Sequence, residues 1–325
     1  MRVIRDLQEL SQPLHSSAVT IGNFDGVHLA HHALFERVVQ SAQAIGGTAV
    51  AITFDPHPAK VLAPQRAPKA LTPLDRKISL IEREGIGLLV ILRFTRKLAM
   101  LSPEQFVDRI LIGKLGAAVV HVGRNFRFGH QRAGDIQTLV ALGQEKGFSV
   151  ETLPMLTIRG ELVSSTRIRQ LLSEGRIGTA CRMLGRTFSI TEPIVTGEGV
   201  GHKLTVPTLN LIPDEEQQLP KNGVYVTMTR LGGAWYQSVT NIGYKPTFGP
   251  HRLGIESYLL DFQGAASTAE MEVEFLYRLR DEIKFPNPQA LKQQIENDVR
   301  RSVKFFRLLE AMKKAQPRPA TSFPV

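Results

Sequence analysis

The amino-acid sequence predicts an α/β domain with a parallel sheet and helices on both faces, followed by a small antiparallel β-barrel that carries a C-terminal helix. As far as about residue 183, apolar runs alternate with amphipathic segments, which is typical of strand–helix–strand units. Beyond Arg186, short segments of alternating polarity replace that pattern, as in antiparallel sheets and barrels. The length of 325 residues agrees, because it suits two domains better than one core.

The first half is expected to contain five strands and four helices. The strands are expected at residues 18–21, 49–54, 88–92, 117–122 and 149–153, and the helices at 33–45, 75–84, 103–112 and 136–146. Ser102 before Pro103 is typical of a helix start, and Gly85, Gly113 and Gly147 each follow a predicted helix. In a parallel sheet of this kind, ligands bind at the carboxyl ends of the strands.

The second half is expected to form the barrel and its helix. Strands are expected at residues 187–190, 194–196, 224–229, 235–240, 256–262 and 271–277, with a hairpin turn at 231–234. A helix begins at Asn287 and Pro288 and is expected to lie against the barrel. We therefore expect one domain at residues 1–185, a second at 186–315, and a proline-rich tail at 316–325 that does not order by itself.

Composition narrows the class of protein. A hydrophobic fraction of 42% with 22% charged residues is ordinary for a soluble globular protein. No apolar run approaches the roughly eighteen residues that span a bilayer, and residues 1–6 lack the apolar core of a signal peptide, so we expect a cytoplasmic protein. The single cysteine, Cys181, excludes an internal disulfide and is expected to be a buried apolar residue.

The net charge of +10 suits polyanions in general, including RNA. The lysines and arginines are dispersed along the chain, however, and a dispersed positive field suits small anionic substrates equally well. The motifs below point to a nucleotide site, so we expect small-molecule substrates and neither a nucleic-acid partner nor a membrane partner. The sequence does not indicate an oligomeric state.

The most informative stretch is residues 22–32, between a predicted strand and a predicted helix. Gly22 and Gly26 permit a tight turn, and the start of the following helix favours phosphate oxygens. His28 and His31 are three residues apart and are expected to share one face of that helix. Two imidazoles beside a helix N-terminus suit the charge on a triphosphate that is attacked at its α-phosphorus. The motif indicates nucleotidyl transfer, although two histidines in a turn can also be solvated or bind a metal.

Three further segments of the first half carry candidate residues. His57 lies in a stiff, proline-rich loop after a predicted strand, and by itself this segment reads as a turn with an exposed histidine. Asn125 lies at 123–129, where the aromatic residues can equally belong to the core. At 164–169, Ser164, Ser165 and Thr166 open a helix and are followed by Arg167 and Arg169. A simple helix cap needs one of those hydroxyls, so the surplus favours a triphosphate-binding loop.

A second candidate site lies in the barrel half. The loop at 197–203 contains Gly197, Gly199, Gly201 and Lys203, and glycines let backbone N–H groups surround phosphates. The Thr208 hydroxyl and the Asn210 side-chain oxygen suit Mg²⁺, which prefers hard oxygen ligands. A glycine-rich run alone is weak support, because flexible loops often contain one.

Together the motifs resemble the bacterial bifunctional riboflavin kinase/FAD synthetase family over nearly the whole chain. In the first half the resemblance rests on Gly22-x-Phe24-Asp25-Gly26-x-His28-x-x-His31 and on the segments 53–58, 123–129 and 164–169. In the second half it rests on the glycine loop before Pro207-Thr208-Leu209-Asn210, and on the segments 241–249 and 256–262. It implies a nucleotidyltransferase-like Rossmann domain that converts FMN to FAD, and a barrel that phosphorylates riboflavin to FMN, with ATP and Mg²⁺.

The resemblance also implies roles for single residues. Glu256 occupies the position of the kinase base, and His57 and Asn125 line the ATP and flavin site. The remaining binding positions implied by the motifs are Gly22, Phe24, Asp25, Gly26, Pro207 and Asn241.

Four positions depart from the family pattern: Ala30, His202, Thr205 and Leu209. Ala30 is tolerated if it lies in the first helical turn, whereas Thr205 and His202 alter a phosphate loop, so the kinase is expected to be the weaker activity. Two other readings remain. In one, only a single step survives, FAD synthesis being favoured; in the other, the chain is a non-catalytic flavin or RNA binder.

Overall fold

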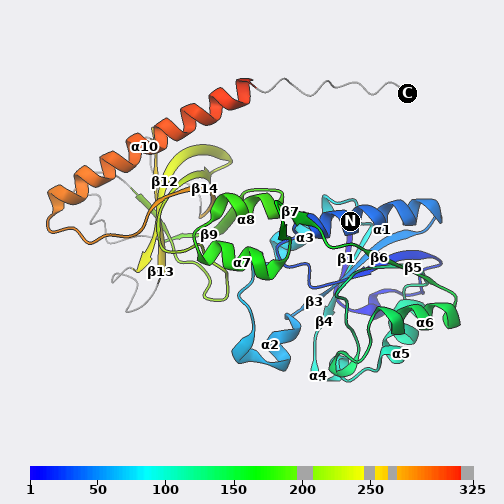
Figure 1. Cartoon of the computed structure of the whole chain (residues 1–325). Coiled ribbons are helices and arrows are strands. Elements are labelled where there is room, and N and C mark those ends of the chain that lie inside the picture. The colour runs from blue at the N-terminus through cyan, green and yellow to red at the C-terminus, as the bar shows by residue number, and fades with distance from the viewer. Residues whose placement is uncertain (196–207, 245–252, 263–268, 316–325) are drawn as a thin grey trace. The chain divides into compact units, whose positions relative to one another are not determined.

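The structure, a computed structural model, describes residues 1–195, 208–244, 253–262 and 269–315, and these fall into two compact units (Figure 1). The first unit contains Met1–Arg169, Met183–Gly185 and Glu216–Gln218. The second contains Gln170–Arg182, Arg186–Glu215 and the chain from Leu219 onward. The units therefore do not divide at one point of the chain, and the boundary after residue 185 stays a prediction for the two activities. The predicted tail at 316–325 lies outside the described residues.

The first unit is built on a six-stranded parallel sheet. Its strands are β1 (Arg2–Ile4), β2 (Ser17–Ile21), β3 (Thr48–Asp55), β4 (Leu88–Arg93), β5 (Ala117–Gly123) and β6 (Ser149–Leu153), in the order β1-β4-β3-β2-β5-β6. All five predicted strands are confirmed; β1, which pairs with β4, was missed because three residues are too few to show a pattern. The strand order reverses between β2 and β5, and in such sheets a ligand crevice opens at that point.

Helices cover both faces of this sheet, as predicted. On one face, α1 (Leu29–Ala44) and α3 (Leu74–Glu82) pack Phe35, Val38 and Ile81 against the small residues of β2 and β3. On the other face, α5 (Pro103–Phe106) and α6 (Ile136–Lys146) pack Phe106 and Leu139 against the same strands. The predicted helix at 103–112 is α5 continued by π-helical residues Val107–Ile112.

Short elements at the carboxyl edge of the sheet complete the first unit. They are α2 (Pro58–Leu62), α4 (Arg96–Ala99), the hairpin of β7 (Thr157–Ile158) and β8 (Glu161–Leu162), and three short 3-10 turns at Leu7–Glu9, Pro64–Arg66 and His130–Arg132. Two helices then contribute to both units: α7 (Ser165–Ser173) and α8 (Ile177–Leu184). The start of α7 was predicted, whereas α2, α4, β7, β8 and the 3-10 turns are too short to show a repeating apolar pattern.

The second unit is a closed antiparallel barrel, as predicted. Its strands are β9 (Phe188–Val195), β10 (Thr208–Leu211), β11 (Gly223–Leu231), β12 (Ala234–Tyr244), β13 (Leu253–Leu259) and β14 (Glu270–Arg280), in the order β10-β13-β12-β11-β14-β9. The hairpin turn is confirmed, since Gly232 and Gly233 have φ angles of 57° and 87° between β11 and β12. The two runs predicted at 187–190 and 194–196 form one strand, β9. Pro193 lies between the two runs, at the point where the pairing of β9 changes from β14 to β10.

Hydroxyl groups fill part of the barrel interior. The side chains of Thr227, Thr229, Ser238, Thr240 and Ser257 are buried and hydrogen-bond in series across β11, β12 and β13, at distances of 2.7 to 2.8 Å. Each buried hydroxyl thus has a partner, which removes most of the cost of burying it.

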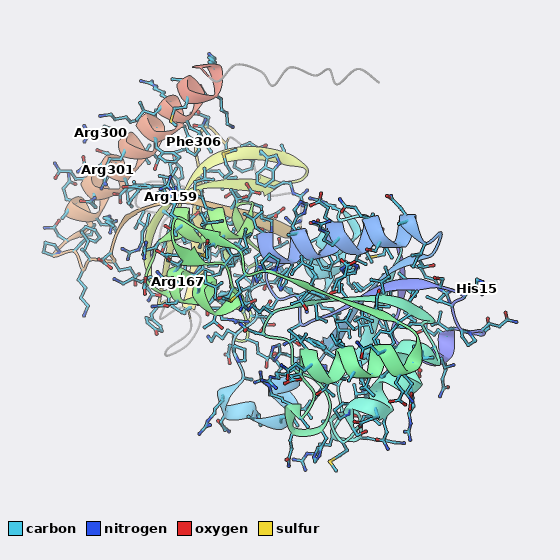
Figure 2. All side chains as sticks on the ribbon, turned by 45° about the vertical axis from the view of Figure 1, so that its right-hand side comes forward. His15, Arg159, Arg167, Arg300, Arg301 and Phe306 are labelled. Atoms are coloured by element: carbon cyan, nitrogen blue, oxygen red, sulfur yellow. The ribbon has the colours of Figure 1, made fainter. Side chains whose placement is uncertain are left out.

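The C-terminal helix α10 (Pro288–Ala315) packs against the outside of the barrel, as expected. The Asn287 side chain accepts a hydrogen bond from the N–H of Ala290 at 2.8 Å and caps the helix. On the side that faces the barrel, Asp298 is buried and bonds to the Arg280 guanidinium at 2.7 and 2.9 Å. Phe306 is also buried, whereas Arg300 and Arg301 are exposed (Figure 2).

Candidate functional site

The two histidines of the first motif lie together at the start of α1. His28 is the residue before the first helical turn and is 5% exposed, and His31 is three residues on. Their rings stack with centroids 3.6 Å apart, and the His28 backbone N–H donates to Nδ1 of His31 at 3.3 Å. The predicted shared face is confirmed. Because Nδ1 of His31 accepts a hydrogen bond, the proton of the neutral ring lies on Nε2.

Glycine and an aromatic ring shape the turn before these histidines. Phe24 has a left-handed φ of 47° and is buried, with its ring edge-on to His31 at 5.3 Å. A Cβ at Gly22 would lie 2.7 Å from this ring, so only glycine fits there. Gly26 has a φ of 88°, which also favours glycine. Ala30 lies inside the first helical turn and has no positive φ, as expected for a tolerated substitution.

Asp25 links this turn to two other segments. Its carboxylate accepts hydrogen bonds from the backbone N–H groups of Leu71 at 3.0 Å and Thr72 at 3.1 Å, and it forms an ion pair with Arg169. Nε of Arg169 in turn donates to the Lys69 carbonyl at 2.7 Å. Both predicted binding residues therefore hold the turn against residues 69–72, a contact that the sequence did not indicate.

The three hydroxyls at the start of α7 have different surroundings. The Ser164 hydroxyl accepts from the N–H of Arg167 at 3.2 Å, and the Ser165 hydroxyl donates to the Asp25 carbonyl at 2.8 Å. Thr166 is exposed. The Arg167 side chain, labelled in Figure 2, bonds to Glu161 at 2.7 Å. Thus two of the three hydroxyls have structural partners, and binding of phosphate by Ser164, Ser165, Thr166 and Arg167 stays a prediction.

A cavity of about 880 Å³ opens where the sheet order reverses. The loops after β2, β3, β4 and β5 all line it, and its polar lining includes Asn23, His57 and Asn125. Most of the lining is apolar, with the rings of Phe54, Phe94, Phe106, Phe126 and Phe128. A cavity of this size, with aromatic walls and a few polar groups, suits a flat heteroaromatic ligand. Gly22 lines it too, but His28 and His31 do not, so the cavity and the histidine pair are separate parts of the candidate site.

His57 presents a donor to this cavity. Its Nδ1 accepts a hydrogen bond from the N–H of Ala59 at 3.1 Å, at the start of α2, so the neutral ring carries its proton on Nε2. Burial lowers the pKa of His57, and this outweighs the opposing effect of Asp25. At neutral pH the ring is therefore an uncharged hydrogen-bond donor.

Lys77 is a candidate that the sequence reasoning missed. It lies on α3, is 9% exposed, and its Nζ donates to the Asn23 carbonyl in the turn at 3.1 Å. Burial lowers its pKa, with Asp25 and Asp55 opposing the shift. The available signal was its position, because the buried Leu80 and Ile81 follow three and four residues later and place Lys77 on the apolar face of its helix.

The candidate kinase residues gather on the outside of the barrel. Asn210 on β10 and Asn241 on β12 both pair with Glu256 on β13. The Thr208 hydroxyl donates to Oε1 of Glu256 at 2.8 Å. Three separate sequence motifs thus meet across neighbouring strands. The exposed carboxylate of Glu282, also missed, accepts from the Asn241 amide at 3.5 Å.

Several predicted residues of this second site fall outside the described residues. They are Gly197, Gly199, Gly201, Lys203 and Pro207, together with the departures His202 and Thr205. Their roles stay predictions. The fourth departure, Leu209, pairs on β10 with Ser257, on the face opposite that of Thr208 and Asn210.

Known proteins are similar to both halves of the chain. Residues 10–167 match the FAD synthetase family model and residues 184–306 match the riboflavin kinase model. A protein from Pseudomonas fluorescens, named bifunctional riboflavin kinase/FMN adenylyltransferase, is 35% identical over 300 residues, which cover 92% of this chain and 96% of that one. The chain belongs to this bifunctional family. An Escherichia coli K12 member with the same name is 33% identical over 95% of this chain and 99% of its own.

The family fold extends to a solved structure. A Streptococcus pneumoniae chain, named as a macrolide-efflux protein, aligns with a TM-score of 0.83 at 25% identity and covers 92% of this chain and 97% of that chain. No helix among the described residues has the length and apolar character that crossing a membrane requires. The bifunctional family therefore accounts for both units, and the likeness to that chain is one of fold.

Proposed function

We propose that the chain uses ATP twice, first to phosphorylate riboflavin to FMN and then to transfer AMP to FMN, which gives FAD and pyrophosphate. The observation that carries this proposal is the presence of two separate candidate sites. The first unit has a cavity and a histidine pair, and the barrel has Glu256 beside Thr208, Asn210 and Asn241. Each lies within the segment that matches the corresponding family model, so one chain carries the residues for both steps.

In the adenylyl transfer, a phosphate oxygen of FMN attacks the α-phosphorus of ATP, and the bond from that phosphorus to pyrophosphate breaks. His28 and His31 stabilise the phosphate charge that develops, because their imidazole rings stack at the N-terminus of α1, where negative charge is favoured. Gly22, Phe24, Asp25 and Gly26 give the turn its shape. Ser164, Ser165, Thr166, Arg167 and Arg169 complete the proposed triphosphate-binding region.

The apolar cavity takes the flat ring of a substrate. His57 and Asn125 supply hydrogen bonds at its polar edge, where an uncharged His57 can donate without the cost of burying a cation. The buried Lys77 ammonium lies against the turn and is proposed to add positive charge near the phosphates. Aromatic walls exclude water, which strengthens these electrostatic contacts.

In the kinase step, the riboflavin 5′-hydroxyl attacks the γ-phosphorus of ATP, ADP leaves, and Glu256 accepts the hydroxyl proton. Thr208 and Asn241 orient the carboxylate and neighbouring groups on adjacent strands. The glycine loop with Gly197, Gly199, Gly201, Lys203 and Pro207 is proposed to surround the ATP phosphates.

The residues near Glu256 also fit Mg²⁺. The Thr208 hydroxyl and Asn210 side-chain oxygen are hard ligands beside a carboxylate. No group of three His, Cys, Asp or Glu side chains arranged to hold a metal occurs among the residues that the structure describes. The proposed ion therefore depends on substrate phosphates for part of its coordination, and it would supply charge neutralisation at those phosphates. A nucleic-acid partner or a membrane partner is not proposed, and a cytoplasmic location stays a prediction.

The position of a phosphorus label tests the proposal. Given riboflavin and ATP labelled at the γ-phosphate, the chain should place label in FMN and then FAD. Given FMN and ATP labelled at the α-phosphate, it should place label in FAD alone. If the α-label enters FAD but the γ-label does not enter FMN, the chain catalyses only the adenylyl transfer. If neither label is transferred, the chain is a non-catalytic binder.

A further inference from the structure

A short segment from the kinase half of the sequence belongs to the first unit. Glu216–Gln218 lies between β10 and β11 in sequence, inside the segment that matches the riboflavin kinase model, yet it packs with the first unit. Gln217 is 2% exposed, so this is a buried contact. Neither polar atom of its side chain has a hydrogen-bond partner among the described residues, which indicates that the side chain is held by packing and by the backbone around it.

The backbone of the 216–218 segment pairs with residue 70 like a short strand. The N–H of Ala70 donates to the Glu216 carbonyl at 2.8 Å, and the N–H of Gln218 donates to the Ala70 carbonyl at 2.8 Å. Both hydrogen-bonding groups of Ala70 are therefore fixed by this segment. Glu216 also forms an ion pair with Lys60 on α2, the helix that His57 caps.

The residues beside Ala70 hold the adenylyl transfer motif. The N–H groups of Leu71 and Thr72 donate to the Asp25 carboxylate, and the Lys69 carbonyl accepts from Arg169. The Leu71 side chain is buried and lies so close to Gly26 that a Cβ there would be 2.9 Å from it. Residues 69–72 thus lie between the 216–218 segment and the turn that leads into His28.

We infer that the 216–218 segment is a positioning element for adenylyl transfer, supplied from within the kinase half of the sequence. It fixes Ala70, which places the N–H groups of Leu71 and Thr72 for Asp25 and so sets the turn before His28 and His31. Small displacements of a catalytic group reduce rates strongly, so loosening this contact lowers FAD synthesis although no residue of the segment needs to touch substrate. The inference rests on the proposed function of the first unit.

Gln218→Pro in the full chain tests the inference. Proline removes the N–H that bonds to Ala70, while the extended conformation it imposes on Gln217 already suits strand pairing. The matched control is Gln218→Ala, which keeps that N–H. We expect Gln218→Pro to lower kcat/KM for FAD synthesis roughly ten- to a hundredfold, and Gln218→Ala to stay within twofold of the parent. Riboflavin phosphorylation should be unchanged in both variants.

Hydrogen exchange provides a readout that does not depend on activity. In Gln218→Pro, peptides covering residues 69–74 should exchange faster, while those from β4 and β5 should not change. Trp235 and all five tyrosines lie in the second unit, so their fluorescence monitors that unit separately.

A second variant covers the case in which Gln218→Pro fails to fold. Glu216→Lys places like charges at the pair with Lys60 and should accelerate exchange at 69–74, and adding Lys60→Glu should restore it. Parent-like exchange at 69–74 together with parent-like FAD synthesis in Gln218→Pro would overturn the inference. A parent that makes no FAD contradicts the proposed function instead, and the exchange measurement then still decides whether the segment holds residues 69–72.

Discussion

The two ring nitrogens of His57 have different roles, one toward the local backbone and one toward the cavity. Nδ1 caps α2 through the N–H of Ala59, which leaves Nε2–H for a ligand in the cavity. The division between the two nitrogens can be tested because asparagine places an acceptor at nearly the same distance from the backbone as Nδ1 and is a good helix cap.

We predict that His57→Asn retains stability and loses FAD synthesis. The cap is kept, so the melting temperature of the first unit should stay near the parent value. The Nε2–H donor is lost, because the shorter asparagine amide does not reach that position, and KM for a flavin or ATP should rise. His57→Ala, which loses both, should also be destabilised by about 1 kcal/mol. Thermal melts and steady-state kinetics measure this, and unchanged kinetics in His57→Asn would remove His57 from the site.

Substitutions in the two sites should have opposite effects on the two activities. Glu256→Gln should lower riboflavin phosphorylation about 10²-fold, the low end for a general base, because loose phosphoryl transfer needs little help from one. It should leave FAD synthesis from supplied FMN intact. His28→Ala and His31→Ala should do the reverse, each costing about 10² in adenylyl transfer. Equal loss of both activities in any variant would indicate misfolding. A variant that loses neither activity would show that the substituted residue takes no part in catalysis.

Residue roles were predictable where a motif places several chemical groups within a few positions, as at His28 and His31. They were not predictable where the partner lies far along the chain. Asp25 and Arg169 are 144 residues apart and form an ion pair, and nothing in either local sequence indicates it. Lys77 was missed because a lysine within an apolar helical face was taken as part of an ordinary amphipathic helix.

At the level of elements, β5 carries a fully buried histidine between α1 and β6. Nε2 of His121 hydrogen-bonds with the Ser41 hydroxyl at 2.8 Å, and Nδ1 lies 3.5 Å from the exposed carboxylate of Glu151. Burial lowers the pKa of His121, with Glu151 opposing and Arg37 reinforcing the shift. The folded pKa is therefore below the unfolded value of about 6.5.

The sign of the pH dependence follows from proton uptake. Between the two pKa values the unfolded state binds more protons, so stability is complete above about pH 6.5 and falls as the pH is lowered toward the folded pKa. We predict that His121→Gln flattens the loss of stability of the first unit between pH 7 and 5. Hydrogen exchange of β5 and β6 measures this, and an unchanged slope contradicts it. His57 titrates in the same direction, so some slope should remain.

Elements with a long repeating pattern were predictable from sequence, and short elements were not. The predicted parallel strands and the helix at α6 agree closely with the structure, because burial on one or both faces imposes a regular pattern on five or more residues. β1 and β10 have three and four residues, too few to show one. The residues of β10 were recognised only for their chemistry, as Thr208 and Asn210.

On the scale of the whole molecule, the two compact units do not consist of two consecutive halves of the sequence. Residues 170–182 lie before the predicted boundary at 185 but pack with the barrel unit, where Cys181 is partly buried and its sulfur accepts from the N–H of Phe188 at 3.3 Å. Conversely, residues 216–218 belong to the first unit. A change in hydrophobic pattern locates where the architecture changes, but it does not show which unit each connecting segment joins.

We therefore predict that a fragment of residues 170–325 phosphorylates riboflavin and that a fragment of 186–325 is less stable. The shorter fragment lacks the end of α7 and all of α8, whose buried Leu171, Leu172 and Ala180 pack with the second unit. Trp235 fluorescence during thermal unfolding compares the two fragments. Equal melting temperatures would favour a clean boundary at 185.

One chain carries both activities, and chromatography of its flavin products provides a direct test. The full chain is incubated with riboflavin, excess ATP and Mg²⁺, and the flavins are separated over time. We expect FMN to appear first and then to be converted to FAD, with little FMN accumulating because the kinase is expected to be the slower step. Riboflavin that stays unchanged while supplied FMN becomes FAD, or FMN that forms without ever yielding FAD, would contradict it.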